Sequence, residues 1–268
     1  MRLSLQGRAI AYDLVGPEDA PVICMTHSLS SDGGMWAEQM PPLLAAGFRV
    51  LRLDMRGHGG SAPVPGPYTM AALADDVALA LDALAIPKVH YIGLSIGGML
   101  GQGFAIRHPH RVLSAMWCDT LPQTPPGGEA VWQERMDTVR KAGSLEPGAD
   151  AALERWFTDA FKPRRPGRWK QMRDTVATTT PEGYLGCSAA IANYDWTPDL
   201  PKLNLPVLVV CGDQDPGTPP EGNKRIAALV PGGRYEEIKD AKHFPNIERD
   251  AVFNRIMMDW FTTQRSRG

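Results

Sequence analysis

The most constraining feature of this chain is a Gly-Leu-Ser-Ile-Gly segment at residues 93–97, set between two different apolar patterns. The short run Val89–Ile92 before it predicts a buried strand, and the small and apolar residues after it predict a helix. A very tight strand-to-helix turn needs glycine two residues before and after its central residue, because side chains would not fit there. The segment therefore predicts that Ser95 is a nucleophile at such an elbow, backed by a helix N-terminus. The alternative is a glycine-rich turn with an incidental serine.

A nucleophilic serine needs a general base, and the base needs a carboxylate that orients it. His243 follows a predicted strand at 234–238 and precedes a helical pattern, so it stands in a loop near the end of the chain. The other histidines lie in a predicted strand, in turns, beside a proline at a helix end, or after the strand Val22–Thr26. They are His27, His58, His90, His108 and His110. His243 is therefore the candidate base.

Three aspartates are candidates for the orienting carboxylate. The β-branched run Pro206–Cys211 predicts a buried strand, and the turn after it carries Asp213 and Asp215. Asp119 follows another predicted strand, Val112–Cys118. Each stands at the carboxyl end of a strand, and the residues alone leave the choice open.

Strand-like runs alternate with helical patterns, which predicts an α/β fold with a mainly parallel sheet covered by helices on both faces. The expected strands are Arg8–Leu14, Val22–Thr26, Phe48–Asp54, Lys88–Ile92, Val112–Cys118, Pro206–Cys211 and Arg234–Ile238. The alternation stops between residues 121 and 200, where helical patterns are separated by proline- and glycine-rich breaks. We therefore expect a core of residues 1–120 and 201–268 and an all-helical lid at 121–200.

Over its whole length the chain resembles α/β-hydrolases, and among them 3-oxoadipate enol-lactonases and related carboxylesterases. The segments that carry the resemblance are 54–61, 93–99, 155–158, 183–187 and 241–248. It implies the α/β-hydrolase fold and a serine hydrolase that cleaves a carboxylic ester or lactone through an acyl-enzyme intermediate. Dehalogenases and epoxide hydrolases of this fold carry a carboxylate at the elbow, so Ser95 argues against both. A perhydrolase, a C–C bond hydrolase and a weakly catalytic ligand receptor remain alternatives.

The resemblance also implies roles for single residues of the catalytic triad. In such proteins the chain order is serine, acid, histidine, and the acid stands fourth in the Gly-x-x-Asp turn, which is Asp215 here. Asp213 would then brace the turn through local hydrogen bonds. Asp119 is the second choice, because some relatives place the acid after that strand.

Two backbone N–H groups are expected to bind the developing oxyanion. One belongs to Ile96, the residue after the nucleophile, and by resemblance the other belongs to Leu29. Many relatives have glycine where this chain has Ser28, so the N–H of Ser28 stays an alternative donor. His27 belongs to the same loop, and both His27 and Ser28 are candidate substrate contacts.

The predicted lid is rich in aromatic and basic side chains. Trp132, Trp156 and Tyr194 are candidates for an apolar substrate pocket, although most lid aromatics are expected to pack the helices together. Six basic residues occur without an acidic one between them: Lys162, Arg164, Arg165, Arg168, Lys170 and Arg173. They predict a solvated helix face, and the alternative is the attraction of a carboxylate-bearing substrate.

Composition is that of an ordinary enzyme that binds a small molecule. With 268 residues and a net charge of −2, nothing points to nucleic acid or to a membrane surface. There is no apolar run of 18 residues and no signal peptide pattern, so we expect a cytoplasmic protein. The four cysteines are far apart and read as core residues, and no spacing predicts a metal or a cofactor. A homo-oligomer is compatible with the sequence.

Overall fold

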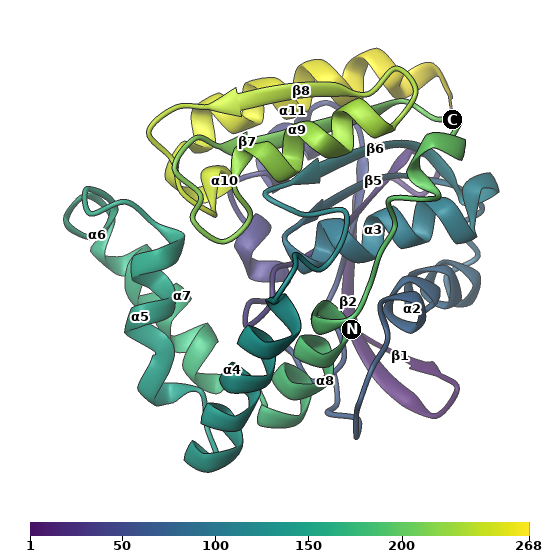
Figure 1. The fold of residues 1–268 in the computed structure, drawn as a ribbon. Helices are drawn as coiled ribbons and strands as arrows, with labels where there is room; N and C mark the ends of the chain where they lie inside the picture. Colours follow the sequence, from purple (N-terminus) through teal and green to yellow (C-terminus); the bar gives the residue numbers. More distant parts are fainter. Residues whose placement is uncertain (268) are drawn as a thin grey trace.

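A computed structural model describes residues 1–267, and a single eight-stranded sheet forms its centre (Figure 1). The strands are β1 (Arg2–Leu5), β2 (Arg8–Val15), β3 (Val22–Thr26), β4 (Arg49–Leu53), β5 (Val89–Leu94), β6 (Val112–Cys118), β7 (Val207–Gly212) and β8 (Arg234–Ile238). Their order across the sheet is β1-β2-β4-β3-β5-β6-β7-β8. The pairs β1–β2 and β2–β4 are antiparallel, and all other pairs are parallel. The seven predicted strands are confirmed within a few residues at each end, and β1 is an additional strand that the sequence analysis missed.

From β3 onward the helices alternate with these strands, except in one long segment. They are α1 (Met40–Ala45), α2 (Met70–Ala83), α3 (Ile96–Arg107), α4 (Gly128–Ala142), α5 (Ala149–Trp156), α6 (Phe161–Arg164), α7 (Pro166–Thr178), α8 (Pro181–Ala192), α9 (Pro220–Leu229), α10 (Pro245–Glu248) and α11 (Asp250–Gln264). Short 3₁₀ helices occur at Gly33–Trp36, Pro109–Arg111, Glu146–Gly148, Leu200–Lys202 and Arg265–Arg267.

Two hydrophobic clusters cover the two faces of the sheet, because neighbouring residues of a strand point to opposite sides. Cys24 and Tyr91 belong to one cluster, together with residues of α2, α3 and α9. Ile23 and Ile92 belong to the other, together with residues of α1 and α11. A parallel sheet buried on both faces needs near-continuous apolar strands, which is why the central runs read as strands in the sequence.

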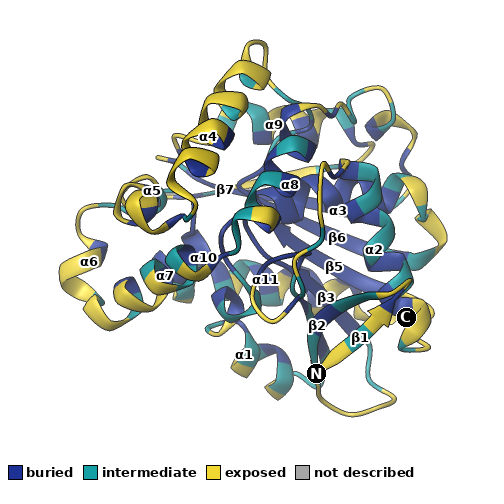
Figure 2. Ribbon diagram, turned by 90° about the horizontal axis from the view of Figure 1, so that it is seen from below, coloured by how far each residue is buried: buried dark blue, intermediate teal, exposed yellow. Residues whose placement is uncertain are grey.

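Residues 121–200, here called the insertion, contain five α-helices and no strand, and one isolated bridge pairs Gln123 with Asp195 (Figure 1). Helix α8 lies beside α4 and packs on the same cluster as α2 and α3. Helices α5 and α7 contact each other and pack on the cluster of α11. The outer sides of α4, α5 and α6 are mostly exposed, as Figure 2 shows. The insertion therefore contacts the apolar clusters of both faces of the sheet.

The fold bears on two expectations from the sequence, one about the cysteines and one about membrane-spanning helices. Cys24, Cys118 and Cys211 lie in strands and Cys187 lies in α8, and all four are buried free thiols, which confirms them as core residues. In the part of the chain from residue 1 to residue 267, no helix combines the length and the apolar character that crossing a membrane requires.

Candidate active site

Ser95 stands between β5 and α3 in a strained backbone conformation, with φ 60° and ψ −122°. This is the left-handed region that non-glycine residues rarely adopt. A Cβ atom on Gly93 would lie 2.2 Å from the carbonyl oxygen of Gly97, and one on Gly97 would lie 2.5 Å from the carbonyl oxygen of Thr26. The flanking glycines are therefore required by close backbone contacts, as the motif predicts.

The segment after β6 holds the elbow through two hydrogen bonds to the backbone of Ser95. The N–H of Ser95 donates to the carbonyl oxygen of Cys118 at 2.9 Å. The hydroxyl of Thr120 donates to the carbonyl oxygen of Ser95 at 2.8 Å. The backbone N–H and the carbonyl oxygen of Ser95 therefore both have hydrogen-bond partners. The side-chain hydroxyl of Ser95 takes no part in these two bonds. Only 8% of Ser95 is exposed.

His243 and Asp215 meet in loops that follow β8 and β7. Nδ1 of His243 lies 2.7 Å from Oδ2 of Asp215. The other oxygen of Asp215 accepts hydrogen bonds from the backbone N–H groups of Gly217 and Thr218, at 2.8 and 3.1 Å. The hydroxyl of Thr218 donates to Asp215 and lies 3.3 Å from Nδ1 of His243. Thr218 is a neighbour of the pair that the sequence analysis missed, although it stands only three residues after Asp215.

The charge state of Asp215 follows from these contacts. Burial alone would raise the pKa of this carboxyl. The nearby His243 and the hydrogen bonds from His243, Thr218 and Gly217 outweigh burial and lower the pKa of Asp215 to about 2. Asp215 is therefore an anion at neutral pH and only accepts hydrogen bonds, so Nδ1 of His243 must carry the proton. Nε2 of His243 is then left with a free lone pair.

The other two candidate aspartates have different partners. Asp213 accepts a hydrogen bond from the N–H of Ala241 at 3.4 Å and lies 3.7 Å from the ammonium group of Lys239. Asp119 is fully buried, and its Oδ1 accepts the N–H of Gly212 at 2.9 Å. Neither forms a hydrogen bond to His243 among the described residues.

The loop after β3 separates the two candidate oxyanion donors of the sequence analysis. The N–H of Ser28 donates to the sulfur of Met35 at 3.3 Å. The N–H of Leu29 and the N–H of Ile96 have no hydrogen-bond acceptor within residues 1–267. Two free backbone donors therefore remain, the N–H groups of Leu29 and Ile96. The engagement of Ser28 through Met35 could not be read from the sequence, because sulfur acceptors have no local pattern.

His27 is fully buried, and both of its ring nitrogens are engaged. Nε2 accepts the backbone N–H of Met55 at 2.8 Å, so Nδ1 must be the protonated nitrogen, and it donates to the carbonyl oxygen of Ser28 at 2.8 Å. Burial lowers the pKa of His27. The ring of His58 lies 5.3 Å away, centroid to centroid. His27 thus connects the loop after β3 to the loop after β4. Because both ring nitrogens are already engaged, neither is free to bind a substrate, contrary to the expectation from the sequence.

The three aromatic candidates of the insertion occupy different surroundings. The ring of Trp156 packs on Phe244, the residue after His243, with centroids 4.6 Å apart. Trp132 is half-buried and packs against the cluster of α2 and α3. The hydroxyl of Tyr194 donates to the carbonyl oxygen of Leu121 at 3.0 Å. Trp156 is therefore placed beside the His243 loop, whereas the polar atom of Tyr194 fastens the two ends of the insertion to each other.

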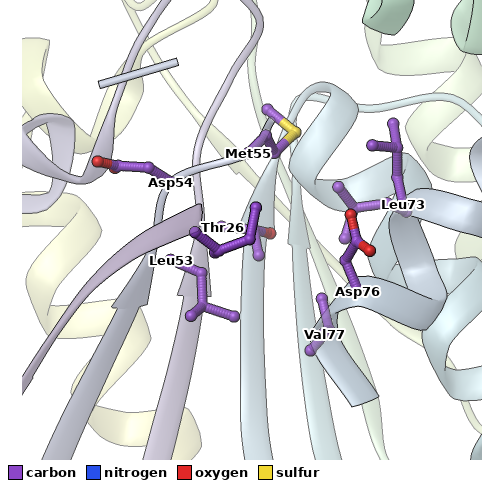
Figure 3. A pocket seen from close by; sticks show the side chains of 9 residues that line it. Thr26, Leu53, Asp54, Met55, Leu73, Asp76 and Val77 are labelled. Carbon is purple, nitrogen blue, oxygen red and sulfur yellow. The ribbon is translucent and has the colours of Figure 1, made fainter. Parts of the chain in front are cut away.

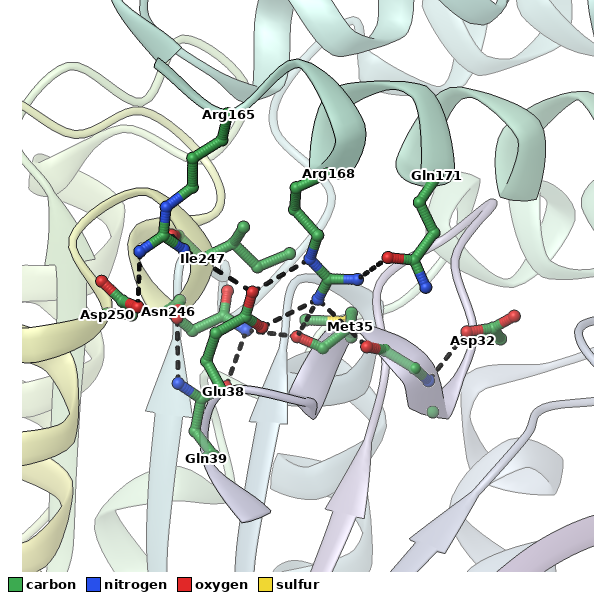
Figure 4. Close-up of polar contacts among 12 residues, drawn as sticks. Asp32, Met35, Glu38, Gln39, Arg165, Arg168, Gln171, Asn246, Ile247 and Asp250 are labelled. Carbon is green, nitrogen blue, oxygen red and sulfur yellow. Dashed lines mark hydrogen bonds and ion pairs between the residues drawn. The ribbon is translucent and has the colours of Figure 1, made fainter. Parts of the chain in front are cut away.

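The basic residues of the insertion form ion pairs with acidic residues far away in the sequence (Figure 4). Arg168 donates to both carboxylate oxygens of Glu38, at 3.0 and 2.8 Å, and to the carbonyl oxygen of Gly34 at 3.0 Å. Arg165 donates to Asp250 at 2.8 Å. The expectation of a merely solvated face is wrong for Arg165 and Arg168, since these side chains fasten α7 to the 3₁₀ helix after β3 and to α11.

Three further members of the basic group are also engaged, and Lys162 lies over the ring of Trp169, with Nζ 4.9 Å from the centroid. Arg164 donates to the carbonyl oxygen of Glu248 at 2.8 Å. Arg173 pairs with Glu146 and Asp150, at 2.8 and 2.9 Å. Lys170 pairs with Asp174 one turn later, at 2.5 Å. These partners leave little free positive charge for a substrate.

Two other arginines of the insertion have no acidic partner. Arg135 of α4 stacks on Trp132, with the guanidinium carbon 4.7 Å from the ring centroid. Neither Arg135 nor Arg155 of α5 forms an ion pair or hydrogen bond with any described side chain or carbonyl. Desolvation by neighbouring protein atoms, followed by the positive charge of Arg135, lowers the pKa of Arg155. Tyr184 of α8 lies near both guanidinium groups. The two cations are thus close enough to repel each other.

Two hollows lie away from Ser95 and His243. The cavity of Figure 3, about 20 Å³, lies between the end of β4 and helix α2, where Met55 and Asp76 line it. That volume suits a single water molecule. A surface hollow of about 390 Å³ is lined by polar residues such as Asp13 and Arg52. Neither hollow contains a candidate catalytic residue, so neither is the expected substrate pocket.

One group of residues has the composition of a metal site. An oxygen of Asp119, an oxygen of Asp215 and a ring nitrogen of His243 all lie within 4.8 Å of one another. The Nδ1 proton of His243 already occupies the space between His243 and Asp215, and Asp215 accepts further hydrogen bonds from the Thr218 segment. These oxygen and nitrogen atoms are therefore better suited to share hydrogen bonds than to bind a metal cation.

Comparison with known proteins agrees with this geometry. The family model of the alpha/beta hydrolase fold matches residues 21–250. The chain is 34% identical to 3-oxoadipate enol-lactonase 2 of Acinetobacter baylyi over 95% of this chain and 94% of that protein. The crystal structure of the enol-lactonase of Burkholderia xenovorans LB400 superimposes with a TM-score of 0.93 and 36% identity, covering 98% of this chain and all of that one.

A more distant relative is an esterase. The thermophilic esterase of Thermogutta terrifontis, solved with malate bound, is 26% identical and superimposes with a TM-score of 0.91 over 99% of this chain and 98% of that chain. Together with the strained Ser95 elbow and the sheet order, these similarities show that the chain belongs to the α/β-hydrolase family.

Proposed function

We propose that this protein is a serine hydrolase that cleaves a carboxylic ester or lactone, with an enol-lactone as the favoured type of substrate. The observation that carries the proposal is the hydrogen bond of 2.7 Å between Nδ1 of His243 and Asp215. It fixes the tautomer that a general base needs, and it occurs in a chain with a serine at the family's elbow. The enol-lactonase relatives support the choice of a lactone.

In this proposal Ser95 attacks the carbonyl carbon of the substrate, and Nε2 of His243 takes the hydroxyl proton. No hydrogen bond joins Ser95 to His243 in the described part of the structure, and such contacts commonly tighten only in the substrate complex. When the tetrahedral intermediate collapses, the bond between carbonyl carbon and leaving oxygen breaks, and His243 gives its proton to that oxygen. Water then attacks the carbonyl carbon of the acyl-enzyme and gives a proton to His243. When this second intermediate collapses, the bond between the carbonyl carbon and Oγ of Ser95 breaks, His243 returns the proton to Oγ, and the acid product releases its own proton to solvent.

The free N–H groups of Leu29 and Ile96 would bind the oxyanion of both intermediates. Leu29 is favoured over Ser28 because the N–H of Ser28 is engaged with the sulfur of Met35. Since His27 holds this loop through Met55 and Ser28, its role is to position the donors. Of the three aromatic candidates, Trp156 is the one that we place nearest His243, because its ring packs on Phe244, the next residue along the chain.

We further propose that Arg135 and Arg155 bind a carboxylate of the substrate. A pair of cations without acidic partners favours an anion, because the anion removes their mutual repulsion. The basic residues 162–173 are poor candidates for this role. Arg165 and Arg168 are paired with core carboxylates (Figure 4), Arg164 donates to a core carbonyl, and Lys170 and Arg173 pair with acidic residues of the insertion. The malate-bound esterase supports the idea that a relative can accommodate a small dicarboxylate.

The insertion would then cover the active site as a lid on a core of residues 1–120 and 201–268. It leaves the core after the carboxyl end of β6, the strand between β5 and β7, at the edge of the sheet where Ser95 follows β5 and Asp215 follows β7, and the chain then returns to the amino end of β7. Action in the cytoplasm and assembly into a homo-oligomer remain predictions from the sequence.

The test of the function is a hydrolysis panel of nitrophenyl esters of increasing acyl length, simple lactones and 3-oxoadipate enol-lactone. We expect multiple turnovers by the wild type and a loss of at least about 10³-fold in kcat for Ser95→Ala. Ser266→Ala, an exposed serine in the last turn of the chain, is the matched control. Wild-type turnover by a folded Ser95→Ala protein would refute the assignment of the nucleophile, and ligand binding without turnover by the wild type would favour a receptor.

The test of the carboxylate site compares charged and neutral substrates. Arg135→Gln and Arg155→Gln should each raise KM about tenfold for a carboxylate-bearing lactone, which corresponds to about 1.4 kcal/mol. Neither should change KM for a neutral ester of similar size. Arg140→Gln is the control, because this arginine is exposed on the same helix as Arg135 and pairs with Asp137. Equal effects on both substrates would contradict the carboxylate site and leave the hydrolase proposal standing.

A further inference from the structure

We propose that Asp119 is a positioning residue for the catalytic pair: it stays an uncharged carboxylic acid at neutral pH and directs its proton toward Asp215. The inference rests on the proposed function only in naming Asp215 and His243 as the catalytic pair. It gives a role to the aspartate that the sequence left as an alternative triad member.

The first observation is a buried oxygen without a partner. Asp119 is fully buried, and its Oδ1 accepts the N–H of Gly212. Its Oδ2 is buried as well and has no hydrogen-bond partner among the described residues. A buried anionic oxygen in that situation is strongly destabilising, whereas a protonated oxygen needs only an acceptor. An oxygen of Asp215 lies within 4.8 Å of an oxygen of Asp119 without a hydrogen bond between them, and a small movement of either carboxyl group would make Asp215 that acceptor.

The second observation is the unequal number of donors around the two carboxyl groups. Asp215 accepts hydrogen bonds from Gly217, from both donors of Thr218, and from His243. Asp119 accepts one backbone hydrogen bond. Two carboxylates this close in a buried site do not both ionise, so one of them keeps a proton. Since the donors stabilise the anion of Asp215, the proton belongs to Asp119.

The direction of the pKa values agrees with this division. Burial, followed by the negative charge of Asp215, raises the pKa of Asp119 well above its usual range. The titratable groups that face Asp119 are Asp215 and His243 on the loops after β7 and β8, Cys118 at the end of β6, Cys211 on β7 and Tyr235 on β8. Burial raises the pKa of both thiols and of the phenol, so these three groups add no charge at neutral pH.

The position of Asp119 in the chain explains why such a contact would matter. Its neighbours Cys118 and Thr120 bind the N–H and the carbonyl oxygen of Ser95. Its own N–H donates to the carbonyl oxygen of Val210 on β7 at 2.8 Å. Three consecutive residues therefore fasten the nucleophile on one side and reach Asp215 on the other. A hydrogen bond from Asp119 would set the position of the catalytic pair relative to the elbow.

The experiment measures kcat/KM against pH for the wild type, Asp119→Asn and Asp119→Ala. An asparagine can donate to Asp215 and accept from Gly212, so it imitates the neutral acid. We expect Asp119→Asn to keep kcat within about threefold of wild type and to leave the acidic midpoint in place. Asp119→Ala removes a donor from Asp215, so the charge of Asp215 acts more strongly on His243. We expect the midpoint to rise by about 0.5 to 1 pH unit and kcat to fall about tenfold.

An anionic Asp119 would shift the acidic midpoint of kcat/KM in the opposite direction. If Asp119 were an anion, it would stabilise protonated His243, and both variants would lower the midpoint. That result, or unchanged midpoints and rates in both variants, would overturn the proposal. The readout separates positioning from a general structural role, because a loss of stability alone does not move the midpoint.

A second measurement needs neither turnover nor a folded alanine variant. The carboxyl carbon of Asp119, assigned in wild-type protein by comparison with Asp119→Asn, should keep the chemical shift of a protonated acid between about pH 5 and pH 8. A shift typical of a carboxylate would refute the inference. If instead no ester or lactone is hydrolysed, the proposed function fails, and this spectrum still decides the state of Asp119.

Discussion

Glu248 accepts hydrogen bonds from both the backbone N–H and the hydroxyl of Thr158, a residue 90 positions away in the loop between α5 and α6. The same carboxylate accepts the N–H of Lys242 at 3.3 Å. Glu248 is almost fully buried. One side chain thus joins the insertion to the residue before His243, so the placement of the candidate base depends on the docking of α5 and α6.

We predict that Glu248→Ala loosens the His243 loop. The change leaves three donors without their acceptor in a buried place, which should lower the free energy of unfolding by about 3 kcal/mol. It should also lower kcat more than it raises KM, because the base loses its position rather than the substrate its contacts. Glu182→Ala is the control, as this glutamate is exposed in the first turn of α8. An unchanged kcat in a destabilised Glu248→Ala protein would show that the loop is held without Glu248.

The ranking of the three aspartates is a separate prediction. Asp215→Asn should lower kcat by about 10³-fold or more, because the anion that fixes the His243 tautomer is lost. Asp213→Asn should have a small effect, since Asp213 contacts the turn at Ala241 and the ammonium group of Lys239. Circular dichroism and the melting temperature Tm establish that each variant is folded. A larger fall in kcat for Asp213→Asn than for Asp215→Asn would show that Asp213, not Asp215, is the acid of the catalytic triad.

The sequence could predict the parts of this site that local geometry dictates. The glycines around Ser95 are required because Thr26 and the helix backbone leave no space for a Cβ atom, so the pattern itself reports the turn. The central strands were predictable because burial on both faces makes them continuously apolar. Strand β1 escaped prediction because it has only four residues at the edge of the sheet, in which two exposed residues alternate with one half-buried and one buried leucine.

Contacts between distant segments could not be predicted in the same way. Arg168 and Glu38 are 130 positions apart, and the sequence shows only that one lies in a basic stretch. The run from 162 to 173 looked like a single charged face, yet its members point to different partners. The hydrogen bond from the N–H of Ser28 to the sulfur of Met35 could not be predicted from the sequence either. Such pairings depend on tertiary structure, which leaves no periodic signal.

Arg168 offers a test of the insertion's attachment. Its guanidinium is mostly buried against both oxygens of Glu38 and the carbonyl oxygen of Gly34 (Figure 4). Arg168→Gln should lower the free energy of unfolding by about 2 kcal/mol, because it leaves Glu38 with less compensation. For a chain of this size that corresponds to a fall in Tm of about 5 °C. Lys170→Gln should change Tm far less, since it removes an exposed pair with Asp174.

The same variants separate attachment from substrate steering. If Arg168 serves only as a clamp, Arg168→Gln should alter KM equally for charged and neutral substrates. A rise in KM confined to carboxylate-bearing substrates, which weakens as salt increases, would show that this arginine attracts substrate after all. In that case the assignment of the carboxylate site to Arg135 and Arg155 would need revision.

The last prediction concerns acid stability and rests on His90, a buried residue of β5. Burial lowers the pKa of His90 from its ordinary value to about 4, and Nδ1 keeps one hydrogen bond, to Ser114 at 2.9 Å. Because the unfolded chain binds this proton at about pH 6.5 and the folded protein does not, the free energy of unfolding falls as pH drops from about 6.5 toward 4. The contribution of one such residue is at most about 1.4 kcal/mol per pH unit. His90→Asn, which can still bond to Ser114, should make the loss of Tm with falling pH shallower, whereas His110→Asn changes an exposed histidine and is the control. Parallel curves of Tm against pH for wild type and His90→Asn would mean that His90 is protonated without loss of folding free energy, and that another group sets the acid limit.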